Sequence, residues 1–343
     1  MKKEGRKNMR YISKDNLKEG MILATTLYDR HGNRLLAPNV VLTGTYINRI
    51  RNMNFEGVYI FDELSSSIIG HQVISQQTYQ QSIDVVSGGN YDDCMLAANY
   101  IVEDLLSSES VLPNMTSIAS YDRSTFTHSM NVAVVSVIVA MESGYCARQL
   151  REVAAAGLLH DIGKSMIPES VLNKPGRLTD EETRLLHQHP QNGFDMLKDY
   201  STIPAVVKHA VLHHHENYDG SGYPFGKTGN QIHQYARLIH VTDVWDALIT
   251  KRCYKDACCP VDALDYIMNN KSTMFDPAFA DALYNSVHPF STGITVELSN
   301  GENAVVAKNY KGNPVRPDVI VISTRKYMKL TDHPDIVIAK IAV

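Results

Sequence analysis

The feature that most constrains the fold is the stretch 91–290, where apolar residues recur almost throughout at helical spacing. This spacing and its start and stop signals predict helices at 92–107, 126–142, 147–161, 180–188, 190–199, 204–216, 233–250 and 260–270. Thr179 and Glu182 fit a capping box, in which each side chain bonds the other residue's backbone. We therefore expect a mainly α fold, built on a helical bundle.

The two ends of the chain have a different pattern. At the N-terminal end, MILATTLYD, RLLAP and GVYIF (57–61) predict short strands, and 43–53 has helical spacing, so residues 1–62 form a small α+β module. Residues 63–90 are rich in Ser and Gln and predict a connecting segment that is partly helical. Asn300-Gly301 is a strong hairpin signal within 291–343, which predicts a small β module. The helical domain would then span 91–290.

Composition and charge exclude several classes of protein. The chain has 343 residues and 44% apolar residues, enough for more than one domain with a full core. Its formal net charge of −4 argues against binding a nucleic acid polymer. The longest apolar run, near 132–141, is about half of what a bilayer span requires, so no membrane is expected. Five cysteines without a CxxC motif favour a reducing, cytoplasmic location.

Histidines are concentrated in the helical region. Ten of the 14 histidines lie between residues 128 and 240, and histidine is the commonest metal ligand in proteins. The same region holds a long loop, 217–231, with four glycines. A loop of this length inside a compact domain is usually functional.

Seven side chains of the helical region, five histidines and two aspartates, form a candidate set of metal ligands. Asp161 follows His160 at the end of an apolar helix, and its carboxylate has two oxygens that can bridge two metals. Asp243 lies among apolar residues, where a carboxylate is costly unless it is paired or coordinated, and Asp246 could support it. The full set is His128, His160, Asp161, His189, His214, His215 and Asp243. Such a mixture of imidazoles and carboxylates suits iron, manganese, zinc or nickel.

Two motifs carry a resemblance to a known family. HDIGK at 160–164 and HHENYDGSGYP at 214–224 resemble the two signatures of the HD-GYP family, the metal-dependent phosphodiesterases of bacterial cyclic dinucleotides. Further blocks, such as THSMNVAV at 127–134 and VTDVWDAL at 241–248, extend the resemblance over roughly residues 100–285. The implied fold is the helical bundle of the HD domain.

The resemblance implies a role for each matching residue. One metal would be held by His128, His160, Asp161 and Asp243, and the other by Asp161, His189, His214 and His215. Lys164, Arg252 and Lys255 would contact substrate phosphates, and Gly222, Tyr223 and Pro224 would form the loop that gives the family its name. Tyr223 could stack on a base or serve as a packing anchor.

The sequence departs from the family pattern at two places. Some members have a Glu four residues before the first histidine for a third metal; here that residue is Ser124, so we expect two divalent ions, iron or manganese. The frequent Arg-Pro-Tyr is replaced by Arg252, Cys253 and Tyr254. Asp122 is a candidate hydrogen-bond acceptor near the substrate, or a solvated loop carboxylate.

The implied reaction is hydrolysis of cyclic di-GMP to pGpG, to GMP or to both. A hydroxide that bridges the two metals would attack phosphorus, while Lys164 neutralises a non-bridging oxygen. With both metals and the three cationic side chains, the pocket would carry about +4, which attracts a dianionic ring despite the net charge of the chain.

Other functions stay open on the sequence. The substrate could be a mixed cyclic GMP–AMP ring, or the chain could be a nucleotide phosphohydrolase of the wider HD class. It could also be a weak enzyme that binds a cyclic dinucleotide as an effector. The flanking modules have no recognisable motif, and we expect them to pack on the core, to mediate a homodimer or to serve as sensors.

Overall fold

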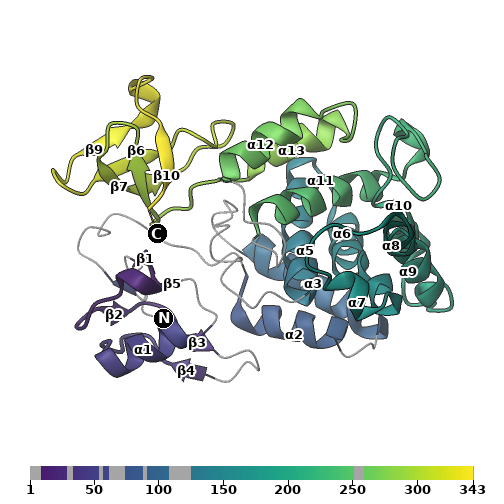
Figure 1. The fold of residues 1–343 in the computed structure, drawn as a ribbon, viewed down its shortest axis with the longest axis horizontal. Helices are drawn as coiled ribbons and strands as arrows, with labels where there is room; N and C mark the ends of the chain where they lie inside the picture. The colour runs from purple at the N-terminus through teal and green to yellow at the C-terminus, as the bar shows by residue number, and fades with distance from the viewer. Residues whose placement is uncertain are drawn as a thin grey trace. The chain divides into compact units, whose positions relative to one another are not determined.

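The structure, a computed structural model, describes residues 9–28, 34–53, 57–61, 74–87, 91–107, 125–250 and 259–342. It divides into two compact units. One contains the described residues up to 61 and those from 287 onward, so that it joins the two ends of the chain. The other contains the described residues from 74 to 286 and is helical (Figure 1).

The helical unit confirms the mainly α fold. Its longer helices are α2 (Gln76–Ser87), α3 (Cys94–Ser107), α5 (Thr125–Glu142), α6 (Ala147–Leu159), α9 (His189–Leu197), α10 (Ala205–His213), α11 (Gln234–Ile249), α12 (Pro260–Asn269) and α13 (Pro277–Ser286). Shorter elements are α7 (Glu169–Leu172), α8 (Asp180–Leu186) and the 3₁₀ turns η3 (Tyr91–Asp93), η4 (Ile162–Met166) and η5 (Gly229–Gln231). The sequence did not predict α7 or α13.

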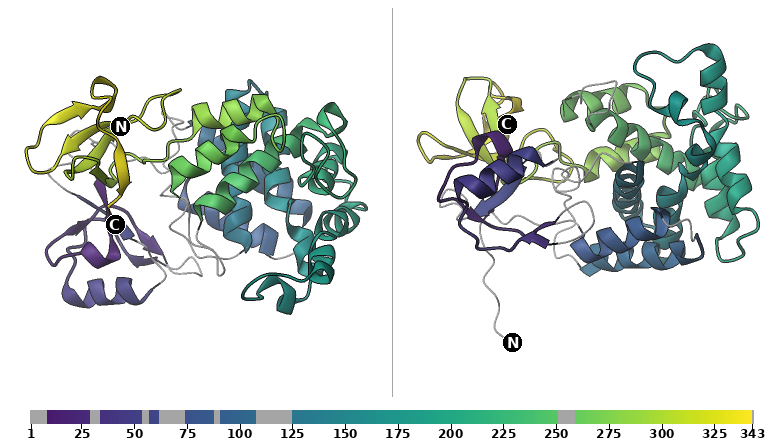
Figure 2. Two further views of the ribbon diagram at one scale, coloured as in Figure 1. Left: turned by 45° about the horizontal axis from the view of Figure 1, so that its top comes forward. Right: turned by 60° about the horizontal axis from the view of Figure 1, so that its bottom comes forward.

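Helix α5 forms the centre of this unit. Its residues from Thr127 to Ala140 are buried apart from His128, which is partly exposed. A helix that is apolar on all sides needs neighbours on all sides. Helices α2, α6, α11 and α13 pack around it, as the ribbon views show (Figures 1 and 2). A histidine in the first turn of α5 therefore lies beside the ends of several other helices.

Two helices that lead into candidate ligands end earlier in the structure than the sequence predicts. Helix α6 ends at Leu159, because Asp161 leaves helical geometry with φ −102° and ψ 5° and the chain turns into η4. Helix α10 ends at His213, so that His214 and His215 lie on the turn that follows it. The predicted capping box is confirmed: the Thr179 side chain accepts from Glu182 N, and Glu182 Oε2 accepts from Thr179 N.

The other unit is built on small antiparallel sheets. Its N-terminal elements are β1 (Met9–Ser13), η1 (Lys14–Asn16), β2 (Ile22–Leu23), β3 (Leu27–Tyr28), β4 (Arg34–Leu36), α1 (Gly44–Asn52) and β5 (Gly57–Phe61). Its C-terminal elements are β6 (Thr295–Leu298), β7 (Asn303–Lys308), β8 (Asp318–Val321), β9 (Tyr327–Lys329), η6 (Leu330–Asp332) and β10 (Ile338–Ile341). The strand orders are β1-β5-β2, β3-β4 and β10-β6-β7-β8-β9.

These sheets confirm the small modules at both ends of the chain. The hairpin at Asn300-Gly301 joins β6 and β7, with Thr295 opposite Val305. A backbone hydrogen bond of 3.1 Å from Tyr11 N to Gly293 O links β1 to the start of the C-terminal module. Strands β1 and β9 were not predicted. Within the described ranges, no helix is both long enough and apolar enough to cross a bilayer.

Candidate metal centre

The structure brings together all seven side chains that the sequence nominated as metal ligands. They come from five helices and the turns beside them. His128 lies in α5, His160 and Asp161 follow α6, His189 begins α9, His214 and His215 follow α10, and Asp243 lies in α11. Their donor atoms form two groups, in each of which all atoms lie within 4.8 Å of one another.

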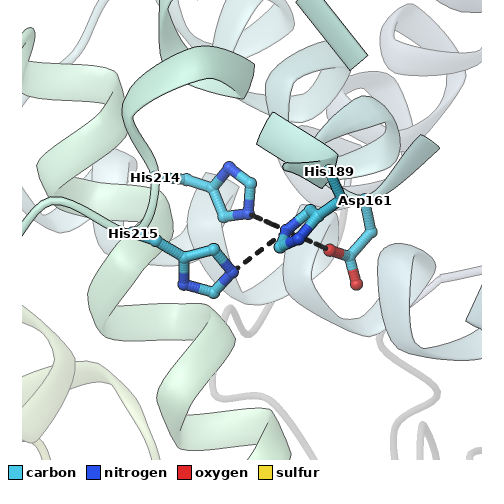
Figure 3. Close-up of side chains that lie close together, drawn as sticks. All are labelled: Asp161, His189, His214 and His215. Atoms are coloured by element: carbon cyan, nitrogen blue, oxygen red, sulfur yellow. Dashed lines mark hydrogen bonds and ion pairs between the residues drawn. The ribbon is translucent and has the colours of Figure 1, made fainter. Parts of the chain in front are cut away.

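The first group consists of Asp161, His189, His214 and His215. His189 Nε2 is its central atom: it lies 3.4 Å from Asp161 Oδ1, 3.3 Å from His214 Nε2 and 3.1 Å from His215 Nε2 (Figure 3). His214 Nε2 lies 3.9 Å from the same oxygen of Asp161. Three imidazole nitrogens and one carboxylate oxygen thus face a common point.

The second group consists of His128, His160 and Asp243. His128 Nε2 lies 3.0 Å from Asp243 Oδ1, and His160 Nε2 lies 3.9 Å from the same oxygen. Both nitrogens also approach Asp161, but through its other oxygen: Oδ2 lies 3.7 Å from His128 Nε2 and 3.4 Å from His160 Nε2. Asp161 therefore faces one group with each of its carboxylate oxygens.

Backbone carbonyls fix the orientation of three of the imidazoles. Nδ1 donates to a carbonyl three residues earlier in each case, from His160 to Gly157 (2.8 Å), from His189 to Leu186 (2.7 Å) and from His214 to Val211 (2.7 Å). This bond leaves the lone pair of Nε2 free to point into the site.

His128 is oriented by a carboxylate instead. Its Nδ1 lies 2.6 Å from Asp246 Oδ2, and Asp246 Oδ1 accepts from Asn131 Nδ2 at 3.0 Å. The contact between His128 on α5 and Asp246 on α11 therefore fixes the imidazole ring, and Nε2 of His128 is directed toward Asp243.

Burial and neighbouring charges set the protonation of the site. Burial lowers the pKa of His189 to about 4 and holds the pKa values of His214 and His215 well below their ordinary range. Burial alone would raise the pKa of Asp161, but Lys164 and His160 beside it hold that pKa well below its usual range. Burial alone would also raise the pKa of Asp243, but its hydrogen bond with His128 holds that pKa well below its usual range.

His128 behaves in the opposite way. Burial disfavours its charged form, but its hydrogen bonds to Asp243 and Asp246 raise its pKa to about 9. At neutral pH the three histidines of the first group are thus uncharged, whereas His128 in the second group is protonated and positively charged.

A close contact between η4 and α9 brings Asp161 to His189. A Cβ on Gly163 would lie 2.0 Å from the carbonyl oxygen of His189 and 2.5 Å from the nitrogen of Gly193. Only a glycine lets the two backbones approach this closely. Lys164 lies on the same turn, and its Nζ is 2.5 Å from Asp161 Oδ2.

The glycine-rich loop folds back onto the histidine pair. A Cβ on Gly222 would lie 2.2 Å from Asn217 N and 2.4 Å from His215 O, so this glycine is required for the loop to close. Glu216 is buried, and its carboxylate accepts from Phe225 N at 2.8 Å and Lys227 N at 3.0 Å. The loop is therefore fixed against the residues that follow α10.

The donor set fits a metal. Asp161 Oδ1 and His160 Nε2 are buried and have no hydrogen-bond partner among the described residues. Buried polar atoms are costly when they are left without a partner, and several of them aimed at one place indicate a cation. The ring nitrogens and carboxylate oxygens are ligands that divalent transition metals accept.

Some predicted substrate contacts cannot be placed. Asp122, Arg252 and Lys255 lie outside the described residues, as does Ser124, on which the expectation of two metals depends. Glu216 and His187 lie close to the candidate ligands, but no role for them was predictable from the sequence. The signal for Glu216 was its place directly after the histidine pair and before a glycine-rich loop.

Comparison with known proteins gives the family context. The sequence model of the HD domain family matches residues 102–279. The chain is 35% identical over 241 residues to the cyclic di-GMP phosphodiesterase PA4108 of Pseudomonas aeruginosa, which covers 70% of this chain and 56% of that protein. It is 31% identical over 187 residues to the 3′3′-cGAMP-specific phosphodiesterase 2 of Vibrio cholerae, over 54% of this chain and 36% of that protein.

A solved structure shares the fold. Bd1817, an HDG"Y"P protein from Bdellovibrio bacteriovorus, superimposes with a TM-score of 0.53 at 17% identity, over 80% of this chain and 98% of that chain. The curated relatives are longer than the match, since the chain spans about half the length of PA4108 and about a third of the Vibrio enzyme.

Proposed function

Because this chain belongs to the HD domain family and carries both HD-GYP signatures, we propose that it is a metal-dependent phosphodiesterase of cyclic di-GMP. It would hydrolyse the ring to pGpG, to GMP or to both. The name of the Pseudomonas relative supports this substrate.

The observation that carries the proposal is the position of Asp161. Its Oδ1 lies 3.4 Å from His189 Nε2, and its Oδ2 lies 3.4 Å from His160 Nε2, so one carboxylate serves two groups of nitrogen donors. A structural histidine–aspartate pair would not need the second group. Two cations, one held by each group and both in contact with Asp161, would account for both groups.

Each group would hold one divalent ion, iron or manganese. Asp161, His189, His214 and His215 would hold one, and His128, His160, Asp243 and the second oxygen of Asp161 would hold the other. When bound, the pair would lower the pKa of a water molecule and stabilise the negative charge that develops on the phosphate oxygens.

The chain itself would bind and orient the phosphodiester. Lys164 Nζ lies beside the shared carboxylate, where its positive charge can neutralise a non-bridging phosphate oxygen. Arg252 and Lys255 would contact the phosphates, and Asp122 would accept a hydrogen bond from the substrate. Gly222 and Tyr223 would line the entrance. A cytoplasmic location and a homodimer stay predictions from the sequence.

A second candidate substrate is the mixed cyclic GMP–AMP ring, which the name of the Vibrio relative favours. Both rings present the same two phosphates to the metals, so the choice depends on contacts with the bases. Head-to-head turnover of the two rings by one preparation would decide. A chain that binds both rings without turnover would instead be an effector.

The proposal predicts hydrolysis by purified protein loaded anaerobically with iron or manganese. Cyclic di-GMP should be converted to pGpG or GMP, identified by chromatography of the products. If a sample with two metals per chain forms no product, the chain is not a cyclic di-GMP phosphodiesterase.

The double variant His160→Ala with Asp161→Ala should lose metal and activity together, because it removes one donor of the second group and the shared carboxylate. His209→Ala, which changes an exposed histidine outside both groups, should retain both. A double variant that still binds two metals per chain would show that the ligand assignment is wrong.

A further inference from the structure

The five imidazoles of the centre are not held in the same way. His160, His189 and His214 donate Nδ1 to a backbone carbonyl, and His128 pairs with Asp246. For His215, the described part of the chain offers Nδ1 no hydrogen-bond partner, although its Nε2 lies 3.1 Å from His189 Nε2. Hydrogen bonds do not explain why this ring points at the site.

An aromatic ring holds His215 in place of a hydrogen bond. The Tyr223 ring stacks on the His215 ring, with centroids 4.7 Å apart and planes inclined by 24°. Tyr223 N also donates to His215 O at 3.1 Å, so the loop returns to the residue whose ring it covers. The close approach at Gly222 makes this return geometrically feasible.

A second imidazole supports the tyrosine. His187 lies at the C-terminal end of α8, and its ring is parallel to that of Tyr223, with a centroid distance of 3.8 Å and an angle of 9°. His187 is exposed and belongs to neither group of metal ligands. It is two residues from His189, so one short turn supplies both a candidate ligand and the support for Tyr223.

We propose that Tyr223 and His187 are positioning residues that fix the ring plane of His215 and thereby set the affinity of the first group for its metal. The inference rests on the proposed metal-dependent function. If the His215 ring rotated about its Cβ–Cγ bond, its edge would move toward Tyr223. The tyrosine has little room to retreat, because the His187 ring lies on it at 3.8 Å.

This role concerns the ring faces and not the hydroxyl or the charge of either residue. Burial raises the pKa of Tyr223, so the phenol stays neutral at ordinary pH. The variants Tyr223→Phe and His187→Tyr should therefore still fix the ring plane of His215. A residue that only fills space would instead be replaced equally well by an aliphatic side chain.

The test measures metal binding directly. Full-length protein is stripped of metal and titrated with Mn²⁺, while free Mn²⁺ is followed by electron paramagnetic resonance. Tyr223→Leu and His187→Ala remove the stack, whereas Tyr223→Phe and His187→Tyr retain it. His209→Ala is the matched control, because it removes an exposed imidazole that contacts the ring of His213 and no candidate ligand.

We expect wild-type protein to bind two Mn²⁺ ions. Supporting residues around metal ligands are worth about 10–100-fold in affinity. Tyr223→Leu should therefore weaken one of the two sites by about that factor, and His187→Ala by about tenfold, while the other site stays unchanged. Both aromatic replacements and His209→Ala should bind both ions as the wild type does.

Three results would overturn the inference. Unchanged binding of both ions by Tyr223→Leu would show that the stack does not position His215. Equal weakening of both sites with a lower thermal midpoint would show a general effect on folding. Failure of Tyr223→Phe to restore the weakened site would show that the hydroxyl matters and not the ring. Wild-type protein that binds neither Mn²⁺ nor, under anaerobic conditions, Fe²⁺ would reject the proposed function itself, so the two failures are distinguishable.

Discussion

At the scale of single residues, the two groups of histidines hold protons differently. The raised pKa of His128, about 9, means that this residue is protonated at pH 7 in the metal-free protein, and a cation must displace that proton. The affinity of the second group should therefore rise by about tenfold per pH unit between pH 7 and pH 9. His189, with a pKa of about 4, is already neutral, so the first group should show no such dependence.

Calorimetry in buffers of different ionisation enthalpy can count the protons released with Mn²⁺. About one proton should leave at pH 7, and fewer as the pH rises toward 9. Asp246→Asn weakens the contact that keeps His128 charged, so proton release should shrink in this variant. Equal affinities at pH 7 and pH 8 for both ions, with no proton release, would contradict this assignment.

At the scale of secondary-structure elements, the contact between η4 and α9 is the most sensitive one. Gly163→Ala would force the turn away from the His189 carbonyl and so separate Asp161 from His189. Overpacking of this kind costs about 1–3 kcal/mol. We expect a lower urea midpoint together with the loss of metal from the first group, measured as metal content per chain.

A loss of stability alone does not test that prediction, so a second variant is needed. Leu264→Ala leaves a cavity beneath α12 and should cost about 2–5 kcal/mol without moving any donor atom. It should keep two metals per chain under conditions where it is folded. Gly163→Ala protein with two metals and wild-type affinity would show that the close contact is not required.

Elements with a strong local pattern were predictable, and those that depend on distant partners were not. Helix α5 is long and apolar, and Thr179 caps α8 in the expected way, so both follow from local sequence. Strand β1 was missed because its five residues acquire their structure by pairing with β5, about fifty residues later, with Tyr11 opposite Tyr59. The early end of α6 depends on Asp161, whose backbone turns away to reach the other donors.

At the scale of the whole molecule, the sequence supplied the candidate residues but not their arrangement. The seven donors were recognisable as residue types, because histidines and aspartates are conspicuous in apolar helices. The division of Asp161 between two groups was a hypothesis, and its two oxygens now lie 3.4 Å from His189 Nε2 and from His160 Nε2. The stack of His187 on Tyr223 was not predictable, since it depends on how a loop closes over a turn.

The flanking unit has a core of its own but contains no candidate ligand among its described residues. The proposed chemistry therefore belongs to the helical unit. The net charge of the chain does not oppose the proposal, because the charge that would meet the substrate is that of the metals and of Lys164.

The most direct test of the central claim is anomalous diffraction from crystals of protein loaded with manganese or iron, recorded at the absorption edge of the metal. We predict two peaks in each chain, one beside His189, His214 and His215 and one beside His128, His160 and Asp243, with Asp161 in contact with both. A single peak, or peaks away from Asp161, would contradict the account.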